Sequence, residues 1–259
     1  MQLSLTPLLL AIELGFLFTL AWRCGRRAPG GAQMMFAYVY FSWLTAYGVF
    51  TSVLGARGIY VSDEVLRTLP GFWLWSVTVA AAVVPILLFG GVRTALRRMV
   101  DVTPWHWFAY FQALRIAALG TALRTELGQF PAYFEYWVGI PDFLFGVSAL
   151  WIAGRAKRGE LSAKSFLVWN LIGALIIVPS APILLQLGLP GPVQLFTESP
   201  DARVVFTYPM SIAPMIGVPL FVLSNLWVAW RLLECGNLAW TPSGFSGAPA
   251  NAAVHLTSS

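Results

Sequence analysis

The stretch "LPGFWLWSVTVAAAVVPILLFGGV", residues 69–92, decides the fold, because it is long, apolar and free of charged side chains. An α-helix rises about 1.5 Å per residue, so about 20 apolar residues span the hydrocarbon core of a bilayer. The whole chain agrees with this pattern. Of its 259 residues 58% are hydrophobic and only 10% are charged, against about 25% in soluble domains, and its mean hydropathy is +0.72. The composition predicts a polytopic membrane protein.

Six further stretches on either side of residues 69–92 are also long and apolar enough to span. We therefore predict an all-α bundle of seven transmembrane helices that forms one domain, residues 1–235. Residues 236–259 are small, polar and contain Pro and Gly, which predicts a disordered cytoplasmic tail. The predicted spans are residues 3–22, 34–56, 69–92, 105–125, 131–153, 165–187 and 206–232.

Basic residues follow every second predicted span, whereas the other loops are nearly balanced in charge. The positive-inside rule then places the N-terminus outside and the C-terminus in the cytoplasm of a bacterial inner membrane. The net charge of +5 comes from these loops, and no continuous basic patch indicates a nucleic-acid partner. The basic clusters are Arg23, Arg26 and Arg27; Arg93, Arg97 and Arg98; and Arg155, Lys157, Arg158 and Lys164.

The cysteines and histidines predict neither a disulfide nor a metal site. Cys24 and Cys235 follow spans that end in the cytoplasm, where thiols stay reduced. His106 and His255 are too few and too far apart for a histidine-based metal centre. We therefore expect no metal and no cofactor.

The stretch "FPAYFEYWVGIPDFLFG", residues 130–146, is apolar yet keeps two acids, Glu135 and Asp142. At 1.5 Å per residue, Asp142 lies about 16 Å below the outer end of its helix, and Arg115 lies about 15 Å above the inner end of the preceding antiparallel helix. Because an isolated charge in the bilayer is costly, we predict that these two residues pair. Gln112, one turn from Arg115, would share their network.

The role of this pair is open at the level of sequence. The presence of the pair is explained equally well by a structural lock between two helices and by a ligand site in which Arg115 anchors a polar or anionic head group. Glu135, only about 6 Å below the outer end, is expected in a water-accessible vestibule and is the candidate catalytic acid. The predicted ligand-binding residues are Arg115, Asp142, Gln112, Glu135, Asn170 and Asn225.

Five prolines interrupt the last two spans, where they leave backbone carbonyls without internal donors. In membranes such breaks are tolerated where protein or water satisfies the freed groups, often beside a cavity. Glu13 in the first span is interpreted as a structural acid with a protein partner. The prolines are Pro179, Pro182, Pro209, Pro214 and Pro219.

The C-terminal 60% of the chain, from "QALRIAALG" through "VWNLIGALIIV" to "YPMSIAPMIGVPLFVLSNLWVAW", resembles a broad group of bacterial seven-helix integral membrane proteins. The resemblance implies a membrane bundle and implies no reaction. This chain departs from the group at Pro141, where the group has glycine, and in lacking a histidine near Asn225. The elements that carry the resemblance are Gln112 and Arg115, Pro131 and Phe134, Asp142 and Gly146, Asn170, and Pro214 and Pro219.

Three functions fit these features. The leading hypothesis is a protein that binds or transports a small polar-headed or lipid-like molecule in an outward-facing pocket between the fourth and seventh helices. The second is a membrane enzyme that acts on a lipid or isoprenoid by acid catalysis through Glu135. The third is an accessory subunit of a larger membrane complex. The partners expected are the lipid bilayer, a small-molecule or lipid ligand, and a membrane protein.

Overall fold

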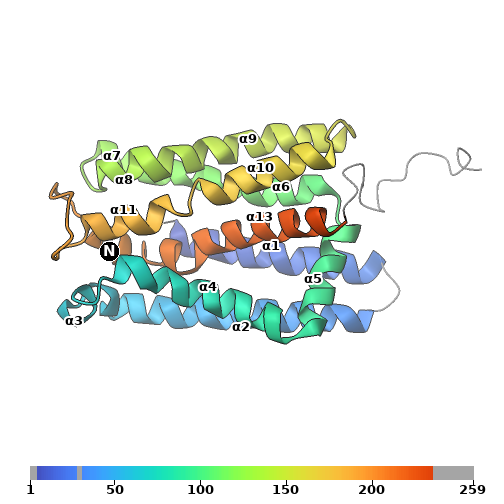
Figure 1. Ribbon diagram of the computed structural model, residues 1–259, viewed down its shortest axis with the longest axis horizontal. Coiled ribbons are helices and arrows are strands. Elements are labelled where there is room, and N and C mark those ends of the chain that lie inside the picture. The colour runs from blue at the N-terminus through green and yellow to red at the C-terminus, as the bar shows by residue number, and fades with distance from the viewer. Residues whose placement is uncertain (1–4, 28–30, 236–259) are drawn as a thin grey trace, which may run out of the picture.

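The computed structural model describes residues 5–27 and 31–235, and every regular element in them is helical (Figure 1). The prediction of an all-α fold is confirmed for these residues, whereas the predicted tail, residues 236–259, lies outside them. The elements are α1 (Thr6–Arg27), α2 (Gly31–Ala56), η1 (Ile59–Val61), α3 (Asp63–Leu66), α4 (Pro70–Leu88), α5 (Gly90–Val102), α6 (Trp105–Ala113), η2 (Leu114–Ala118), α7 (Leu119–Glu126), α8 (Ala132–Phe134), η3 (Glu135–Gly139), α9 (Ile140–Lys157), α10 (Ala163–Leu175), α11 (Ser180–Gly188), α12 (Arg203–Phe206), η4 (Ala213–Gly217) and α13 (Val218–Glu234).

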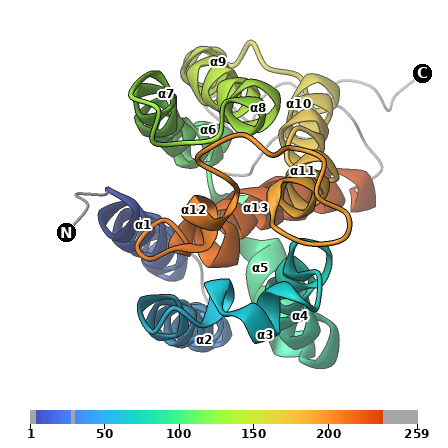
Figure 2. The ribbon, with the colours of Figure 1, turned by 90° about the vertical axis from the view of Figure 1, so that its left-hand side faces the viewer.

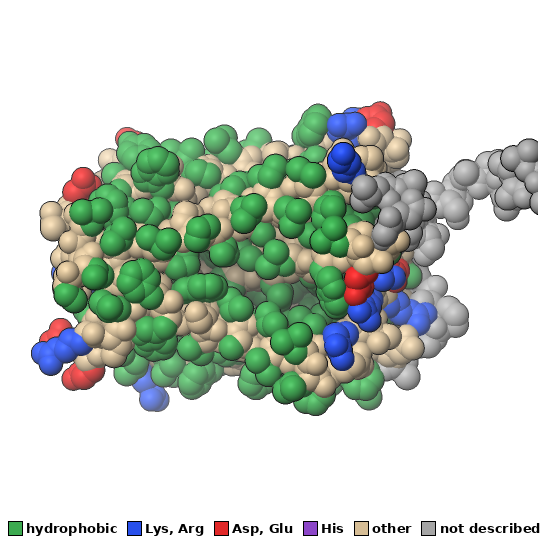
Figure 3. All heavy atoms as spheres, in the orientation of Figure 1, with side chains coloured by type: hydrophobic (Ala, Val, Ile, Leu, Met, Phe, Trp, Pro, Cys, Tyr) green, Lys and Arg blue, Asp and Glu red, His purple; other side chains and the backbone are tan. Residues whose placement is uncertain are grey.

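Within the described residues, six helical stretches are long and apolar enough to cross a membrane. Large hydrophobic side chains such as Trp43, Leu87 and Leu150 stay exposed on the outside of the bundle, and Figure 3 shows hydrophobic side chains across the middle of the face that it displays. Helices that are apolar on their outer as well as their inner face suit lipid rather than water. This is the architecture of a multi-pass membrane protein. The six stretches are Thr6–Arg26, Gln33–Ala56, Pro70–Leu88, Ala132–Lys157, Ala163–Gly188 and Ala213–Glu234.

The stretch predicted as the fourth span, residues 105–125, is not among these six. It is helical from α6 to α7, but the 3₁₀ turn η2 interrupts it. Figure 1 shows α6 toward the end of the bundle that holds α5, and α7 at the opposite end. Gln112 and Arg115, both polar, make this stretch less apolar than the other spans.

Two other predicted spans end or begin at different residues. The span predicted over residues 69–92 stops at Leu88, and α5 then turns across the end of the bundle (Figure 1). One face of α5 is buried through side chains such as Leu96 and Met99, while its arginines lie on the other. The last span begins at Ala213 rather than at residue 206, because residues 207–211 form turns instead of helix.

α13 is the central helix of the bundle, with α1, α5 and α10 around it when the molecule is viewed end-on (Figure 2). Of its apolar window 56% is buried, against 22% for the peripheral α4. Two separate clusters of buried hydrophobic side chains surround it. The larger is built on α1, α2, α5, α6, α9, α10 and α13, and the smaller joins α4, α8, α11 and α12 at the end of the bundle where α1 begins.

The opposite end of the bundle is rich in arginine and lysine (Figure 3). Arg231 pairs there with Asp101 at 2.7 Å and with Glu234 at 3.3 Å. Four guanidinium groups also lie over tryptophan rings at 4.5–5.2 Å from the ring centroids. Cation–π contacts of this kind hold the basic side chains against the aromatic belt at a membrane boundary. The pairs are Arg23 with Trp107, Arg26 with Trp22, Arg97 with Trp230 and Arg155 with Trp151.

A close contact between α4 and α11 fixes the start of α4. The first backbone N–H groups of a helix lack partners within the helix, and here the N–H of Gly71 donates to Oε1 of Gln186 at 2.8 Å. The backbones approach so closely that a Cβ on Gly71 would lie 2.6 Å from the backbone N and Cα of Gln186. Only glycine fits at this position.

We expect Gly71→Ala to lower the free energy of unfolding by about 1–3 kcal/mol, because the added methyl forces α4 away from α11. Thermal unfolding of the protein purified in detergent measures this change. Gly15→Ala is the matched control, since a Cβ there meets no atom within 4 Å, and alanine favours a helix over glycine. Equal midpoints for the two variants would contradict the close α4–α11 contact.

Candidate functional site

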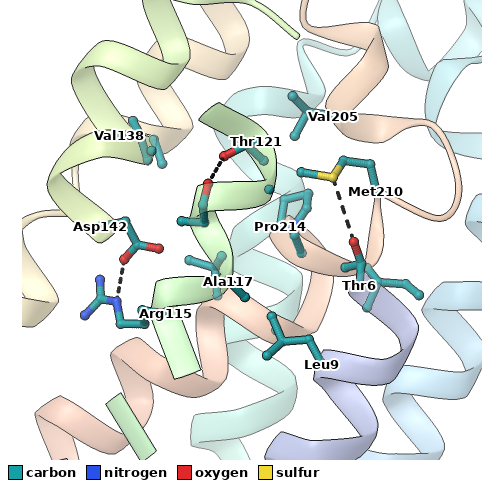
Figure 4. A pocket seen from close by; sticks show the side chains of 18 of the residues that line it. Thr6, Leu9, Arg115, Ala117, Thr121, Val138, Asp142, Val205, Met210 and Pro214 are labelled. Carbon is teal, nitrogen blue, oxygen red and sulfur yellow. Dashed lines mark hydrogen bonds and ion pairs between the residues drawn. The ribbon is translucent and has the colours of Figure 1, made fainter. Parts of the chain in front are cut away.

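A cavity of about 310 Å³ lies between the two hydrophobic clusters. It extends from Thr6 and Arg124, near the end of the bundle where α1 begins, to Arg115, Asp142 and Glu13 in the interior. Most of the lining is apolar, and Figure 4 shows Leu9, Val138, Val205, Met210 and Pro214 around it. A largely apolar cavity of this size with a few convergent polar groups is typical of a small-molecule site.

Four of the helices that line the cavity depart from regular α-helical geometry beside it. η2 is a 3₁₀ turn, and η3 and η4 are π-helical turns. Between α10 and α11 the helix is broken at residues 176–179. Each irregular segment supplies lining residues, for example Ala117, Gly139, Ile177 and Gly217. Irregular backbone inside a membrane is tolerated where it lines a cavity, and π-helical turns are frequent at functional sites.

The predicted pair of Arg115 and Asp142 is present at the inner end of the cavity, where Nε of Arg115 donates to Oδ1 of Asp142. Nη1 of Arg115 donates to the carbonyl of Gly173 at 3.0 Å and to Oε1 of Gln112 at 3.4 Å. Nε2 of Gln112 in turn donates to the carbonyl of Phe221 at 3.2 Å. The network therefore joins η2, α9, α10 and α13 through one guanidinium group.

The two members of this pair face different ways. The side chain of Arg115 has no exposed surface, whereas that of Asp142 keeps 11%. Figure 4 shows the Asp142 carboxylate turned toward the cavity, with the guanidinium nitrogens of Arg115 on its far side. The guanidinium carbon also lies 4.6 Å from the ring centroid of Phe145. Both residues line the inner end of the cavity, but only the Asp142 carboxylate keeps exposed surface there.

Glu13 on α1 belongs to this site, although the sequence did not connect it with the pair. Its side chain is 0% exposed and it lines the cavity. Neither carboxyl oxygen has a hydrogen-bond partner among the described residues, so the predicted protein partner is not found there. A Cβ on Gly217 would lie 3.7 Å from both oxygens, which places the carboxyl group against the π-helical turn η4. Glu13 also interacts electrostatically with Asp142.

Glu135 lies beside the cavity rather than in an open vestibule, so the predicted water-accessible position is wrong. Its side chain is 2% exposed, and its carboxyl oxygens have no well-formed hydrogen bond among the described residues, although Thr121 lies close to them. The carboxyl group packs on Gly139, one turn later, and does not itself line the cavity. The carboxyl group lies back over the π-helical turn of its own helix, and depth along the helix axis could not reveal this.

The two predicted asparagines are buried behind the cavity and do not line it. Asn170 donates to the carbonyl of Phe166, four residues earlier on the same helix, at 2.8 Å. The amide of Asn225 has no hydrogen-bond partner in the described part of the chain and lies next to Gly173, whose carbonyl accepts from Arg115. Asn225 is thus near the network, and Asn170 supports its own helix.

No group of three or more His, Cys, Asp or Glu that could hold a metal occurs in the described part of the chain.

The fold and site define an all-helical protein whose membrane-spanning helices enclose a cavity with a buried charged network. The chain belongs to the family described as domain of unknown function DUF8737, whose family model matches residues 68–233. The matched range contains Arg115 and Asp142 and leaves out α1 with Glu13. No curated protein and no solved structure matches the chain.

We expect Asp142→Asn and Arg115→Gln each to lower the free energy of unfolding by about 3–5 kcal/mol, because each leaves its partner buried and uncompensated. The double variant should recover much of this loss. A double-mutant cycle measured by thermal unfolding in detergent gives the coupling.

Arg158→Gln is the matched control, because its ion pair with Glu160 at 2.8 Å is exposed on both sides. This variant should unfold at the midpoint of the parent. Purely additive effects of the Arg115 and Asp142 substitutions would show that the two charges do not stabilise one another.

Proposed function

We propose that this protein binds or transports a small molecule with a polar head and an apolar body, and that the site is the cavity between α1, α7, α9, α11 and α13. The observation that carries this proposal is that η2, η3, η4 and the break between α10 and α11 all border one cavity that ends on buried carboxylates. Discontinuous helices around a polar site inside the membrane are a recurring feature of transporters.

The side of the cavity toward α1 and α7 supports a ligand that comes from the membrane. Leu5, which immediately precedes α1, is 69% exposed and also lines the cavity. Ala117 and Gly120 on the facing segment line it too, and both are exposed. Exposed lining residues on both sides of this gap support a lateral opening of the cavity. An apolar molecule would enter there without passing through water.

The same cavity bears on the two alternative functions, an accessory subunit and an enzyme that uses acid catalysis. An accessory subunit without a small-molecule site would not need a cavity lined by buried carboxylates. Acid catalysis through Glu135 would require its carboxyl group to meet the substrate, and this group lies outside the lining. Binding or transport is therefore the function that the geometry supports best.

We propose seven membrane crossings, with the N-terminus outside and the C-terminus in the cytoplasm of a bacterial inner membrane. α1 begins at one end of the bundle and α13 finishes at the other (Figure 1), which supports an odd number of crossings. The stretch from α6 to α7 would supply the seventh, since 22 residues extend about 33 Å as a helix. The gathering of Lys and Arg at the end where α13 finishes supports this orientation. The resemblance to bacterial seven-helix membrane proteins stays a prediction.

Ala117→Trp tests the cavity, because the new side chain would obstruct its lateral opening. We expect native mass spectrometry of the parent, extracted in native lipid, to show a copurified small molecule, and the variant to lose it. Leu119→Trp is the matched control, since Leu119 is 46% exposed and does not line the cavity. Equal retention in both variants, or no bound molecule in the parent, would count against the proposed site.

Cysteine labelling in intact cells tests the orientation. In a background of Cys24→Ala and Cys235→Ser, a membrane-impermeant maleimide should label Glu198→Cys directly. It should label Lys164→Cys only after permeabilisation. Both positions are exposed, so burial does not explain a difference, and the reverse pattern would invert the topology.

A further inference from the structure

Glu13 is a buried acid whose hydrogen-bonding capacity is unused. It is 0% exposed and both carboxyl oxygens lack a partner among the described residues. An ionised carboxylate in such surroundings is strongly disfavoured unless a positive group pairs with it. Residues 5–27 and 31–235 supply no positive group that pairs with Glu13, although its carboxyl group borders an empty space large enough for a ligand.

The charges around the inner end of the cavity favour a cation there. Arg115 pairs with Asp142 through Nε, and its Nη1 donates to Gly173 and Gln112, whereas Nη2 has no hydrogen-bond partner among the described residues. Its charge offsets that of Asp142, which leaves the carboxyl group of Glu13 in excess. Arg124 also lines the cavity, but it is in α7, more than two helical turns beyond Arg115.

We propose that the cavity selects a ligand with a protonated amine, and that Glu13 accepts a hydrogen bond from the ammonium group. Asp142 presents its second oxygen to the same space (Figure 4). The apolar body of the ligand packs against side chains such as Leu9, Phe134 and Val138. This inference rests on the proposed function and gives the charge of the ligand head, which is opposite to the anionic head that a free Arg115 would select.

Three probes of equal chain length distinguish the contribution of the head-group charge to affinity from the contribution of the apolar body that fills the cavity. Octylammonium, octanol and octanoate share one apolar body and carry a positive, a neutral and a negative head at pH 7. The full chain is reconstituted in phosphatidylcholine nanodiscs, and the apparent Kd of each probe follows from the concentration dependence of the unfolding midpoint. We expect octylammonium to bind about tenfold more tightly than octanol, as one charge-assisted hydrogen bond provides, and octanoate to bind most weakly.

Glu13→Gln should abolish this preference and leave the affinity for octanol unchanged, because the amide has nearly the same shape and no charge. Glu135→Gln is the matched control. It removes a second buried acid close to the cavity but outside its lining, so the preference for the amine should persist. Loss of the preference in both variants would overturn the assignment to Glu13.

The outcomes distinguish the inference from the proposed function. If octanol and octylammonium bind the parent equally, Glu13 is simply a protonated acid and the amine proposal fails while the cavity remains a binding site. Tightest binding of octanoate would make Arg115 or Arg124 the anchor and also overturn the proposal. If none of the three probes shifts the midpoint, the cavity is not a ligand site and both proposals fail.

Discussion

The structure depends on the burial of one arginine, Arg115, in the interior of the bundle. A guanidinium group cannot lose its charge there, so it must be given acceptors. Asp142 on α9, Gln112 on α6 and the Gly173 carbonyl on α10 supply these acceptors. These acceptors lie on different helices. Hydrogen bonds to one guanidinium group therefore fix the depth and rotation of each helix relative to the others.

The irregular helices follow from this constraint. A 3₁₀ turn at Leu114–Ala118 carries Arg115, and the π-helical turn Glu135–Gly139 immediately precedes the helix that carries Asp142. A third irregular turn, Ala213–Gly217, faces Glu13. Regular helices would pack against each other along their length and close the space between them. Irregular turns instead hold neighbouring helices apart at one level, and the cavity occupies that level.

The cavity combines features that a purely structural network would not need. A charged pair that only locked two helices would be most stable when fully enclosed. Asp142 instead keeps part of its carboxylate open to the cavity, and Glu13 adds a second acid there without a protein partner. Both features cost stability in an apolar environment. Such losses of stability are characteristic of functional sites, where a bound ligand supplies the missing interactions.

The sequence by itself determined the class of the fold, because apolar runs of 20 or more residues have few alternatives to membrane-spanning helices. It also determined the pairing of Arg115 with Asp142, since consecutive antiparallel helices convert residue number directly into depth. It missed the interruption of the fourth span and placed Glu135 in water, because depth along an axis does not show which way a side chain turns.

The tertiary structure alone decided which residues share the cavity. Glu13 and Arg115 are about 100 positions apart in the chain, and α1 is not adjacent to η2 in sequence, so no periodicity relates them. Their proximity arises from the packing of α1 against η4 and η2. Packing also settled which of Arg115 and Asp142 keeps exposed surface in the cavity, because acceptors on α10 and α6 bind the guanidinium group. Residue types and depth are local properties that a sequence records, whereas side-chain orientation and a shared cavity result from contacts among distant helices.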